Sequence, residues 1–473
     1  MREAHEVAAV RTAEAALLEQ GPEDALMRRA AHGLTGVLLA ELGRRHGAVS
    51  GRRVVLLVGA GGNGGDALWA GSFLQRRGVA VTAVLLVPER AHPTGLAALL
   101  KAGGRVGDSS ALTEADLVVD GIVGLSANGG LRPAAAALVA AVRAPIVAVD
   151  LPSGVDPDTG AAADNAVRAA VTVTFGAYKP VHLLAPVHCG RVVLVPLGLE
   201  LPEARLGELE RLEVGALWPV PGPADDKYTQ GVVGVAAGSA QYPGAAVLCT
   251  GAAVAATAGM VRYAGTGKEA VLARWPEVVA VDDIADAGRV QAWVVGPGLG
   301  TGDVCVAALQ RALADEGPVL LDADAITTVA QRPKLLDQRR GPLLLTPHAG
   351  EFARLTGSEP GDDRVSAVRS AAQRFDATVL LKGHTTVIAD PDGQVRVNTA
   401  VGGWAATAGS GDVLSGILGA LLSAGLDPLT AGAAGAHVHA LAAALAADGA
   451  PTSASHLLEQ LPAAIRRARA AQR

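Results

Sequence analysis

The chain has 473 residues, which is too long for one ordinary hydrophobic core and predicts two or three domains. Half of its residues are hydrophobic and only 18% are charged, a balance that excludes wholesale disorder. The net charge of −6 provides no general attraction to polyanions, so we expect no nucleic-acid partner.

The N-terminal segment mixes acidic with basic residues and lacks the continuous apolar stretch of a secretory signal. Apolar runs such as residues 79–87 are far shorter than the roughly 20 residues that a bilayer span requires. We therefore expect a cytoplasmic protein with no membrane partner. Cys189, Cys249 and Cys305 are widely separated, which argues against a disulfide framework and against a thiolate zinc site.

The first half alternates apolar runs with helical or loop segments, after an amphipathic helical opening to about residue 42. The runs are rich in β-branched residues, which predicts strands joined by helices or loops. Repeated units of this kind imply a mostly parallel sheet that helices cover on both faces. The runs lie within residues 52–59, 79–87, 115–124, 144–154 and 170–176.

Prolines, acids and glycines interrupt this pattern between Val214 and Gly231, and we predict a domain boundary there. The first domain would cover residues 1–218 and the second residues 219–473. No residue-level repetition relates the halves, so we expect two different α/β folds in one chain. Strand signals of the second half lie within residues 231–239, 291–300, 317–325, 341–351 and 377–390, and helices follow Gly411.

A glycine loop follows the first predicted strand. Gly59, Gly61 and Gly64 satisfy the G-x-G-x-x-G pattern between a strand and a helix, which is the context of a dinucleotide-binding fingerprint. A dehydrogenase is therefore one candidate. The acid that usually ends the next strand is not cleanly present, because the chain offers only Glu89 there, beyond a proline.

Two later strand ends, at VVDGIVG and VAVDLPSG, would open at the same edge of the sheet as the glycine loop. Asn63, Asp120 and Ser153 supply oxygen atoms suited to a cation, and the loop amides can hold a pyrophosphate. Asp150 stands beside them as a candidate acid or base. Taken singly, Asp66 suits a helix cap, and Asp150 or Asp156 suits a turn, but the spacing of the whole set favours function.

With its G-N-G-G-D loop and D-L-P-S-G turn, the first half resembles the NAD(P)H-hydrate epimerases over residues 12–197. The resemblance implies a Rossmann-like three-layer domain that interconverts the R and S forms of NADHX and NADPHX. Gly62 stands where the family pattern has its first Asn, which removes one side-chain hydrogen bond. The implied potassium ligands are Asn63, Asp120 and Ser153, and Asp150 would contact the hydrated substrate. The implied nucleotide contacts are Gly62, Asn63, Gly64, Gly65, Asp66, Gly124, Leu125, Ser126, Ala127, Asn128, Gly129 and Gly130.

Small residues dominate the stretch NTAVGGWAATAGSGDVLSG in the second half, and they let a backbone approach a phosphate closely. Gly409 and Gly411 precede a predicted helix and would point amides at negative charge. Asp412 follows at once, where it can take a proton from a substrate hydroxyl. Its plainer role would be a helix cap.

The G-S-G-D element resembles the anion hole of ribokinase-like kinases. GAAVLCTGAA, GPGLG, DADA, TPHAGE, KGHTT and GSGDVLSG, in this order, resemble the NAD(P)H-hydrate dehydratases from about residue 227 onward. The resemblance implies a ribokinase-like α/β domain that dehydrates the S-hydrate with ADP, or ATP, and with Mg²⁺ on the phosphates. Trp404 stands in a segment where the family more usually has N-x-G-N-x-G-M-A. The implied hydrate contacts are Ala246, Gly300, His348 and Asp412; the implied adenine-nucleotide contacts are Lys382, Gly383, His384, Thr385, Thr386 and Gly411.

Some of these residues also suit structural roles. His348 lies in a turn where a histidine is often only a hydrogen-bonded group, and Lys382 could extend to solvent. His437 and His439 lie at i and i+2 of an Ala-rich helix and face different sides, so neither is assigned a role.

Three functions stay open at this point. The favoured one is bifunctional hydrate repair by a homo-oligomeric enzyme. The second is a small-molecule kinase of the hydroxymethylpyrimidine or thiazole type fused to a non-catalytic nucleotide-binding domain, although the attached first half speaks against it. The third is a nucleotide-binding sensor or lipoprotein-binding module, for which Gly62 gives some ground.

Overall fold

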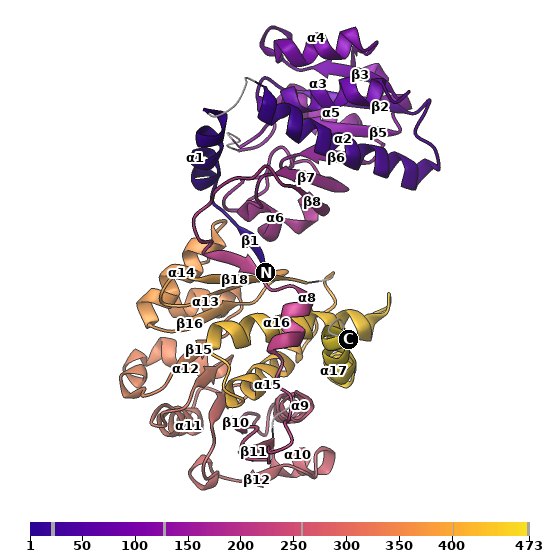
Figure 1. The fold of residues 1–473 in the computed structure, drawn as a ribbon. Helices are drawn as coiled ribbons and strands as arrows, with labels where there is room; N and C mark the ends of the chain where they lie inside the picture. The colour runs from indigo at the N-terminus through magenta and orange to yellow at the C-terminus, as the bar shows by residue number, and fades with distance from the viewer. Residues whose placement is uncertain (20–23, 126–128, 257–258, 401, 471–473) are drawn as a thin grey trace. The chain divides into compact units, whose positions relative to one another are not determined.

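The computed structural model describes residues 1–19, 24–125, 129–256, 259–400 and 402–470. The chain forms two compact units (Figure 1). One is Glu3–Leu206, called the N-unit below. The other joins Met1–Arg2 to Gly207–Arg473 and is called the C-unit.

The sheet of the N-unit has seven parallel strands in the order β4-β3-β2-β5-β6-β7-β8. β2 lies between β3 and β5, so the chain passes there from one half of the sheet to the other, and ligands bind at the carboxyl edge of such a switch point. The strands are β2 (Arg53–Val58), β3 (Ala80–Leu85), β4 (Arg105–Gly107), β5 (Leu117–Gly121), β6 (Ile146–Val149), β7 (Val171–Phe175) and β8 (Arg191–Val195). The helices are α1 (Val7–Leu18), α2 (Ala25–His46), α3 (Gly62–Gln75), α4 (Pro93–Lys101), α5 (Pro133–Ala141), α6 (Pro180–Leu184) and α7 (Pro186–Cys189).

Alternate residues of β2 point to opposite layers, as the pleat of a strand requires. Val54 and Leu56 pack in one core with α2 and α3, whereas Val55 and Leu57 pack in another core with α5. The strand is therefore buried on both faces, which explains its continuous apolar sequence. This arrangement confirms the predicted three-layer α/β domain.

The sheet of the C-unit has the strand order β1-β9-β18-β17-β16-β15-β14-β13-β10-β11-β12. The strands from β10 to β16 run parallel, and β16, β17 and β18 form an antiparallel end. The strands are β1 (Arg2–Ala4), β9 (Leu206–Glu208), β10 (Val232–Ala236), β11 (Met260–Ala264), β12 (Val279–Val281), β13 (Ala292–Val295), β14 (Val319–Leu321), β15 (Leu343–Leu345), β16 (Thr378–Leu381), β17 (Thr385–Ala389) and β18 (Val395–Thr399).

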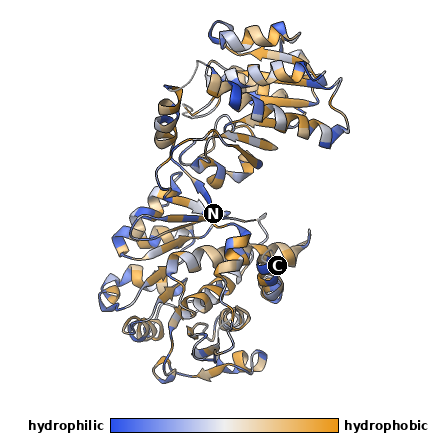
Figure 2. Cartoon of the chain, in the orientation of Figure 1, coloured by the Kyte–Doolittle hydropathy of each residue, from blue (hydrophilic) through white to orange (hydrophobic). Residues whose placement is uncertain are grey.

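A buried layer of helices packs on the parallel part of this sheet. α15 packs against α9 and α16 and against β10 and β13, and Figure 2 shows hydrophobic residues concentrated in these inner elements. Among the described helices, α16 is long and apolar enough to cross a membrane, yet 61% of its apolar window is buried, as in core helices of globular proteins. The helices are α8 (Arg211–Leu217), α9 (Pro243–Ala255), α10 (Lys268–Arg274), α11 (Asp303–Leu313), α12 (Asp324–Gln331), α13 (Ala349–Thr356), α14 (Arg364–Phe375), α15 (Ser410–Ser423), α16 (Pro428–Ala447) and α17 (Ala454–Arg469).

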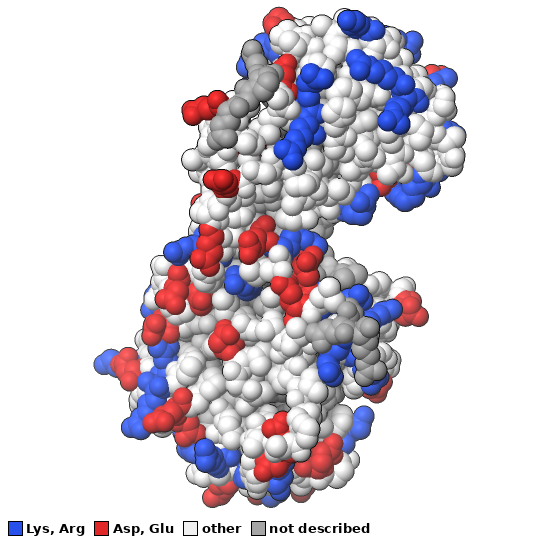
Figure 3. Space-filling model, in the orientation of Figure 1, with Lys and Arg blue, Asp and Glu red and all other residues white. Residues whose placement is uncertain are grey.

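Charged side chains of both signs are interspersed on the face of the C-unit that Figure 3 shows. Lys268 pairs with Asp282 at 2.9 Å, and Arg311 pairs with Asp315 at 2.6 Å. Exposed pairs of this kind contribute only about 0–1 kcal/mol each. The buried helices and strands therefore hold this unit together.

The two compact units divide at Leu206 and Gly207, ahead of the proline-rich segment that the sequence suggests as the boundary. The reason lies in α8, which packs on α17. Val214 and Trp218 are 0% and 2% exposed and belong to the core of the C-unit. Residues 207–218, assigned from the sequence to the first domain, thus pack with the second.

Candidate active sites

The glycine loop between β2 and α3 packs closely against the end of β5. A Cβ on Gly59 would lie 1.8 Å from the carbonyl oxygen of Ile122, and a Cβ on Gly64 would lie 2.3 Å from that of Gly59. Only glycine fits at these two positions. A Cβ on Gly61 or Gly62 would meet no described heavy atom within 4 Å. The loop therefore presents an open face to a ligand.

The three residues predicted to hold a cation lie together. Asp120 accepts hydrogen bonds from the Ser153 hydroxyl at 2.7 Å and from the Ser153 amide at 2.9 Å. Asn63 donates from Nδ2 to the carbonyl of Val149 at 2.5 Å and to that of Val123 at 3.3 Å. Burial raises the pKa of Asp120, while the bonds from Ser153 act in the opposite direction. All three side chains are buried.

The second predicted nucleotide segment covers residues 124–130. A Cβ on Gly124 would meet Oδ1 of Asn63 at 2.5 Å, so this glycine lets the segment approach the cation ligands. Gly129 has a positive φ of 77°, which favours glycine. Leu125 and Gly130 are also described, whereas Ser126, Ala127 and Asn128 lie outside the described residues.

Asp150 follows β6 directly and is buried at the same edge of the sheet. Burial opposes its ionisation, but the ammonium of Lys179, 2.5 Å from Oδ1, holds the pKa of Asp150 below its usual range. The sequence suggested a turn-forming role for Asp150 or Asp156. Asp156 has this role, because its side chain accepts from the amide of Thr159 at 2.8 Å. Asp150 pairs with Lys179 instead.

Two further acids face this pair. Burial, together with the carboxylates of Asp150 and Glu14, raises the pKa of Asp66 well above its usual range. Burial also raises the pKa of Glu14 in α1, against the attraction of Lys179. Asp66 is not in the first turn of α3, so it does not cap that helix. Sequence reasoning missed Glu14 and Lys179, although the position of Lys179 just after β7 is a signal that could have identified it.

In the C-unit, Gly409 is the N-cap of α15 with a φ of +85°, and Asp412 lies in the first turn of that helix. The N-cap position is occupied by Gly409, so Asp412 is not the capping residue of this helix. Burial and the neighbouring carboxylate of Asp322 raise the pKa of Asp412 to about 7, against the opposing charge of Lys382. A carboxyl group with this pKa can accept a proton near neutral pH.

Lys382 lies directly beneath the glycine turn. A Cβ on Gly411 would be 3.5 Å from its Nζ, and Nζ also lies 2.7 Å from Oδ1 of Asp322 and 3.8 Å from Oε2 of Glu351. Burial lowers the pKa of Lys382, but these carboxylates more than offset it and raise the pKa. Oδ2 of Asp322 accepts a bond from the hydroxyl of Ser415 at 2.7 Å. The ammonium group therefore lies beside the N-terminal end of α15, which makes this end a candidate anion site. The segment Gly409–Gly411 is called the anion turn below.

A cavity of about 460 Å³ opens beside this turn. Among the residues expected to contact nucleotide or hydrate, those that line it are His348, Lys382, Gly383, His384, Thr386 and Gly411. Asn398, Ser410 and His439 line it as well. His439 donates from Nε2 to the carbonyl of Ser410 at 2.9 Å, so it supports the anion turn rather than a metal.

Four expected contacts do not line that cavity: Ala246, Gly300, Thr385 and Asp412. Ala246 is fully buried, and a Cβ on Gly238 would lie 2.6 Å from its Cβ. The amide of Gly300 donates to Asp324 at 2.8 Å. His348 caps α13, because its Nδ1 accepts from the amides of Gly350 and Glu351. His348 is therefore a hydrogen-bonded structural group, as the sequence suggested, and its imidazole also lines the cavity.

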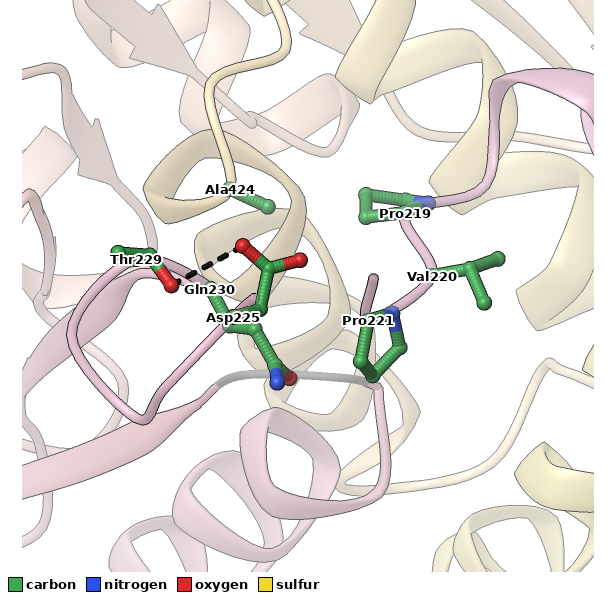
Figure 4. Close-up of a pocket in the computed structure, with 7 residues that line it drawn as sticks. All are labelled: Pro219, Val220, Pro221, Asp225, Thr229, Gln230 and Ala424. Carbon is green, nitrogen blue, oxygen red and sulfur yellow. Dashed lines mark hydrogen bonds between the residues drawn. The ribbon is translucent and has the colours of Figure 1, made fainter. Parts of the chain in front are cut away.

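A smaller hollow of about 170 Å³ lies between the proline-rich segment and the end of α15 (Figure 4). Asp225 in its wall accepts a hydrogen bond from the hydroxyl of Thr229 at 3.1 Å. The lining residues are Pro219, Val220, Pro221, Asp225, Thr229, Gln230 and Ala424. None of them is a predicted site residue, so this hollow is separate from the anion site.

Two family models match the chain. Residues 23–181 match the YjeF-related protein N-terminus, and residues 233–463 match the NAD(P)H-hydrate dehydratases. The first match contains the glycine loop and Lys179. The second contains the anion turn and the cavity.

Curated relatives match nearly the whole chain. The bifunctional NAD(P)H-hydrate repair enzyme Nnr of Mycobacterium leprae is 58% identical over 474 residues, covering 98% of this chain and 99% of the relative. The enzyme of the same name from Mycobacterium tuberculosis is 61% identical over 430 residues, covering 90% of each chain.

Among solved structures, the ADP/ATP-dependent NAD(P)H-hydrate dehydratase of Bacillus subtilis, co-crystallised with ATP and Mg²⁺, has a TM-score of 0.51 at 29% identity. It covers 55% of this chain and 98% of its own. A ribokinase-like protein of Enterococcus faecalis has a TM-score of 0.52 at 24% identity, covering 57% of this chain and 98% of its own, which supports the predicted ribokinase-like fold.

Proposed function

The chain belongs to the family of bifunctional NAD(P)H-hydrate repair enzymes, and we propose that it returns hydrated NADH and NADPH to their working forms in two steps. The N-unit interconverts the R and S hydrates. The C-unit dehydrates the S-hydrate with ADP or ATP. Both family models and the extent of the relatives' alignment support this division.

The observation that carries the dehydratase assignment is the placement of Asp412 and Lys382 at one anion turn. Asp412 takes the proton of the ring hydroxyl while that oxygen attacks the terminal phosphorus of the nucleotide. The ring nitrogen lone pair then expels the phosphate, and loss of a proton from the adjacent ring carbon restores the ring double bond. Lys382 and the amides of the Gly409 turn stabilise the charge on the transferred group, which is where phosphoryl-transfer enzymes gain most of their rate.

Epimerisation is assigned to the carboxyl edge of the N-unit sheet. The glycine loop would bind the pyrophosphate at the start of α3. Asp150, which the ammonium of Lys179 keeps ionised, would take the proton of the ring hydroxyl while the bond from that carbon to the ring nitrogen opens, and would return it when the ring closes on the other face. Asp66, whose pKa is raised, would supply a protonated carboxyl group on the same edge.

Potassium fits the N-unit by its donor set. Asn63, Asp120 and Ser153 offer an amide oxygen, a carboxylate and a hydroxyl within one hydrogen-bonded group, the oxygen ligands that hard cations take. A bound cation would anchor the glycine loop to the ends of β5 and β6. The proposed role of the cation is to order the glycine loop.

We propose that Mg²⁺ binds to the C-unit together with the nucleotide, coordinated by its phosphates, as is common in enzymes. The described residues contain no cluster of three His, Cys, Asp or Glu side chains placed to hold a metal. Asp324 and Asp412 are neighbouring carboxylates, and either could bind a water of a hydrated Mg²⁺. The cytoplasmic location and the homo-oligomeric state stay predictions.

A small-molecule kinase of the hydroxymethylpyrimidine or thiazole type is not favoured. Such a kinase would share the anion turn of the C-unit but would not explain the N-unit. The curated relatives carry both units and the name of a repair enzyme over 98% of this chain.

The test uses the intact chain with mixed R and S hydrates, and follows recovery of the absorbance of the reduced nicotinamide. We expect no recovery without nucleotide and complete recovery with ADP or ATP. The Asp150→Asn variant should consume the S-hydrate rapidly and the R-hydrate only at the spontaneous rate of epimerisation. A parental chain that consumes neither epimer with either nucleotide would refute the proposed function.

A further inference from the structure

Lys179 lies just before α6 and its side chain is 0% exposed. Its Nζ contacts Oδ1 of Asp150 at 2.5 Å, the hydroxyl of Thr174 at 3.1 Å and the carbonyl of Phe175 at 3.0 Å. An ammonium group has three hydrogens, so all of them are used within the protein. Lys179 therefore has no hydrogen left to donate to a ligand.

The two carboxylate oxygens of Asp150 are in different surroundings. Oδ1 accepts from Lys179 and from the amide of Phe175 at 3.3 Å, and it lies 3.0 Å from the hydroxyl of Thr174, whose single hydrogen it shares with the carbonyl of Ala177 at 3.1 Å. Oδ2 has no hydrogen bond to any residue that the structure describes. One oxygen is thus fixed by the protein and the other is left for a ligand.

The backbone of Asp150 is held from the opposite side. Its φ is +66°, an uncommon conformation for a residue with a side chain. Nδ1 of His182 accepts from the amide of Lys179 at 2.8 Å, so the ring hydrogen is on Nε2, which donates to the carbonyl of Asp150 at 2.7 Å. Burial lowers the pKa of His182 to about 4, so this imidazole stays neutral.

We propose that Lys179 is a positioning residue for epimerisation, which holds Oδ1 of Asp150 so that Oδ2 alone meets the ring hydroxyl of the hydrate. This inference rests on the proposed function of the N-unit. Lys179 does not touch the substrate and acts through Asp150.

The charged surroundings of Asp150 make this role measurable. Glu14 from α1 and Asp66 from α3 are acids, and His182 from α6 is neutral. Lys179 is thus the cation that keeps Asp150 ionised among the described groups facing it. Without Lys179, Asp150 would bind its proton at higher pH, and the acid limb of the epimerisation rate would move upward.

The experiment compares the parental chain with Lys179→Met as full-length proteins over a range of pH. We expect the midpoint of the acid limb to rise by about one unit or more, since an adjacent opposite charge shifts a carboxyl group by that amount. Turnover at neutral pH should fall while KM stays within about twofold, because the substrate contacts are unchanged. ADP-dependent dehydration of the S-hydrate in the same sample should be unaffected.

A second pair of variants keeps the test decisive if Lys179→Met fails to fold. Thr174→Val removes one donor to Oδ1 of Asp150 and should move the acid limb upward by a smaller amount. Thr172→Val is the matched control, because this buried threonine of the same strand donates to the carbonyl of Cys189 instead, at 2.7 Å. It should leave the profile unchanged.

Each outcome of these experiments supports or overturns the proposed role of Lys179. An unchanged acid limb in a folded Lys179→Met variant, or equal profiles for the two threonine variants, would overturn the inference. A raised KM with an unchanged pH profile would do so as well, because it would show a direct contact between Lys179 and substrate. A parental chain without epimerase activity would instead be a failure of the proposed function.

Discussion

Nζ of Lys382 donates to Oδ1 of Asp322 across 2.7 Å and so joins the ends of two strands, β14 and β16, that β15 separates in the sheet. Asp322 is 2% exposed at its side chain. Its other oxygen binds Ser415 of α15, so the carboxylate ties both strand ends to the helix that starts at the anion turn.

Removing the cation of this pair should destabilise the fold and weaken nucleotide binding together. Lys382→Met would leave the buried carboxylate of Asp322 unpaired, and such a loss costs about 3 kcal/mol or more. We expect a lower midpoint of denaturant unfolding and a weaker affinity for ADP in calorimetric titration. The matched control is Lys268→Met. Nζ of Lys268 lies 2.9 Å from Asp282, whose side chain is 80% exposed, so loss of this pair should cost about 1 kcal/mol or less. Equal destabilisation by both variants would contradict this account of Lys382.

Dehydration should depend on pH through Asp412. Its pKa is raised to about 7 and its carboxylate is the form that accepts a proton, so the rate should rise as pH increases through about 7 and level off above. Asp412→Asn should abolish this dependence and lower turnover about a hundredfold or more. Because Asp412 is not the N-cap of α15, the variant should fold and bind ADP.

The control for this variant is Asp427→Asn. Asp427 does cap its helix, by accepting from the amide of Thr430 at 3.0 Å, and it lies outside the anion site. Its amide variant should retain the parental rate and pH profile. If Asp412→Asn also retained them, Asp412 would have no role as a base.

The parallel core of both sheets could be predicted, because strands buried on both faces appear in the sequence as continuous apolar runs. The antiparallel end could not. Residues 377–390 read as one strand, but Lys382, Gly383 and His384 turn the chain, and two strands form a hairpin. The strands β1 and β9 have three residues each, too few for a period to show.

The candidate site residues were predictable where they lie at the end of a strand or in the loop or turn that follows it. Asn63, Asp120 and Ser153 were predicted in this way. In the structure Asp120 and Ser153 are hydrogen-bonded at 2.7 Å, and Asn63 and Ser153 both bond to the backbone of Val123. Lys179 follows β7 in the same manner. Glu14 could not be identified from local sequence, because it reaches the site from a helix that precedes the first strand of the N-unit sheet.

Adding a side chain should have opposite effects at two glycines of the glycine loop, Gly62 and Gly64. Gly62 has no described heavy atom within 4 Å of a built Cβ, and glycine in a helix is less stable than alanine by up to about 1 kcal/mol. We expect Gly62→Ala to keep or raise stability, and Gly62→Asn to raise affinity for the hydrate by adding a hydrogen-bonding side chain. Gly64→Ala should lose epimerisation, since its Cβ would lie 2.3 Å from the carbonyl oxygen of Gly59. Thermal unfolding and epimerase assays of the three variants measure this contrast.

The boundary between the units can be tested by comparing three C-terminal fragments of the chain. A fragment that begins at residue 207 keeps all of the C-unit after its first strand, and it should fold and dehydrate the S-hydrate. A fragment that begins at residue 219 lacks α8 and with it the buried Val214 and Trp218, and loss of a buried tryptophan alone costs about 3–5 kcal/mol. It should therefore unfold at a clearly lower temperature or be insoluble.

The third fragment begins at residue 210, so it lacks β9 but keeps α8 with its capping residue Glu210. It separates the effect of the edge strand from that of the helix. Because α8 supplies the buried side chains, we expect this fragment to melt close to the one that begins at residue 207. Equal melting temperatures for the fragments that begin at residues 210 and 219 would show that α8 does not stabilise this unit, and the predicted division in the proline-rich segment would then be the better one.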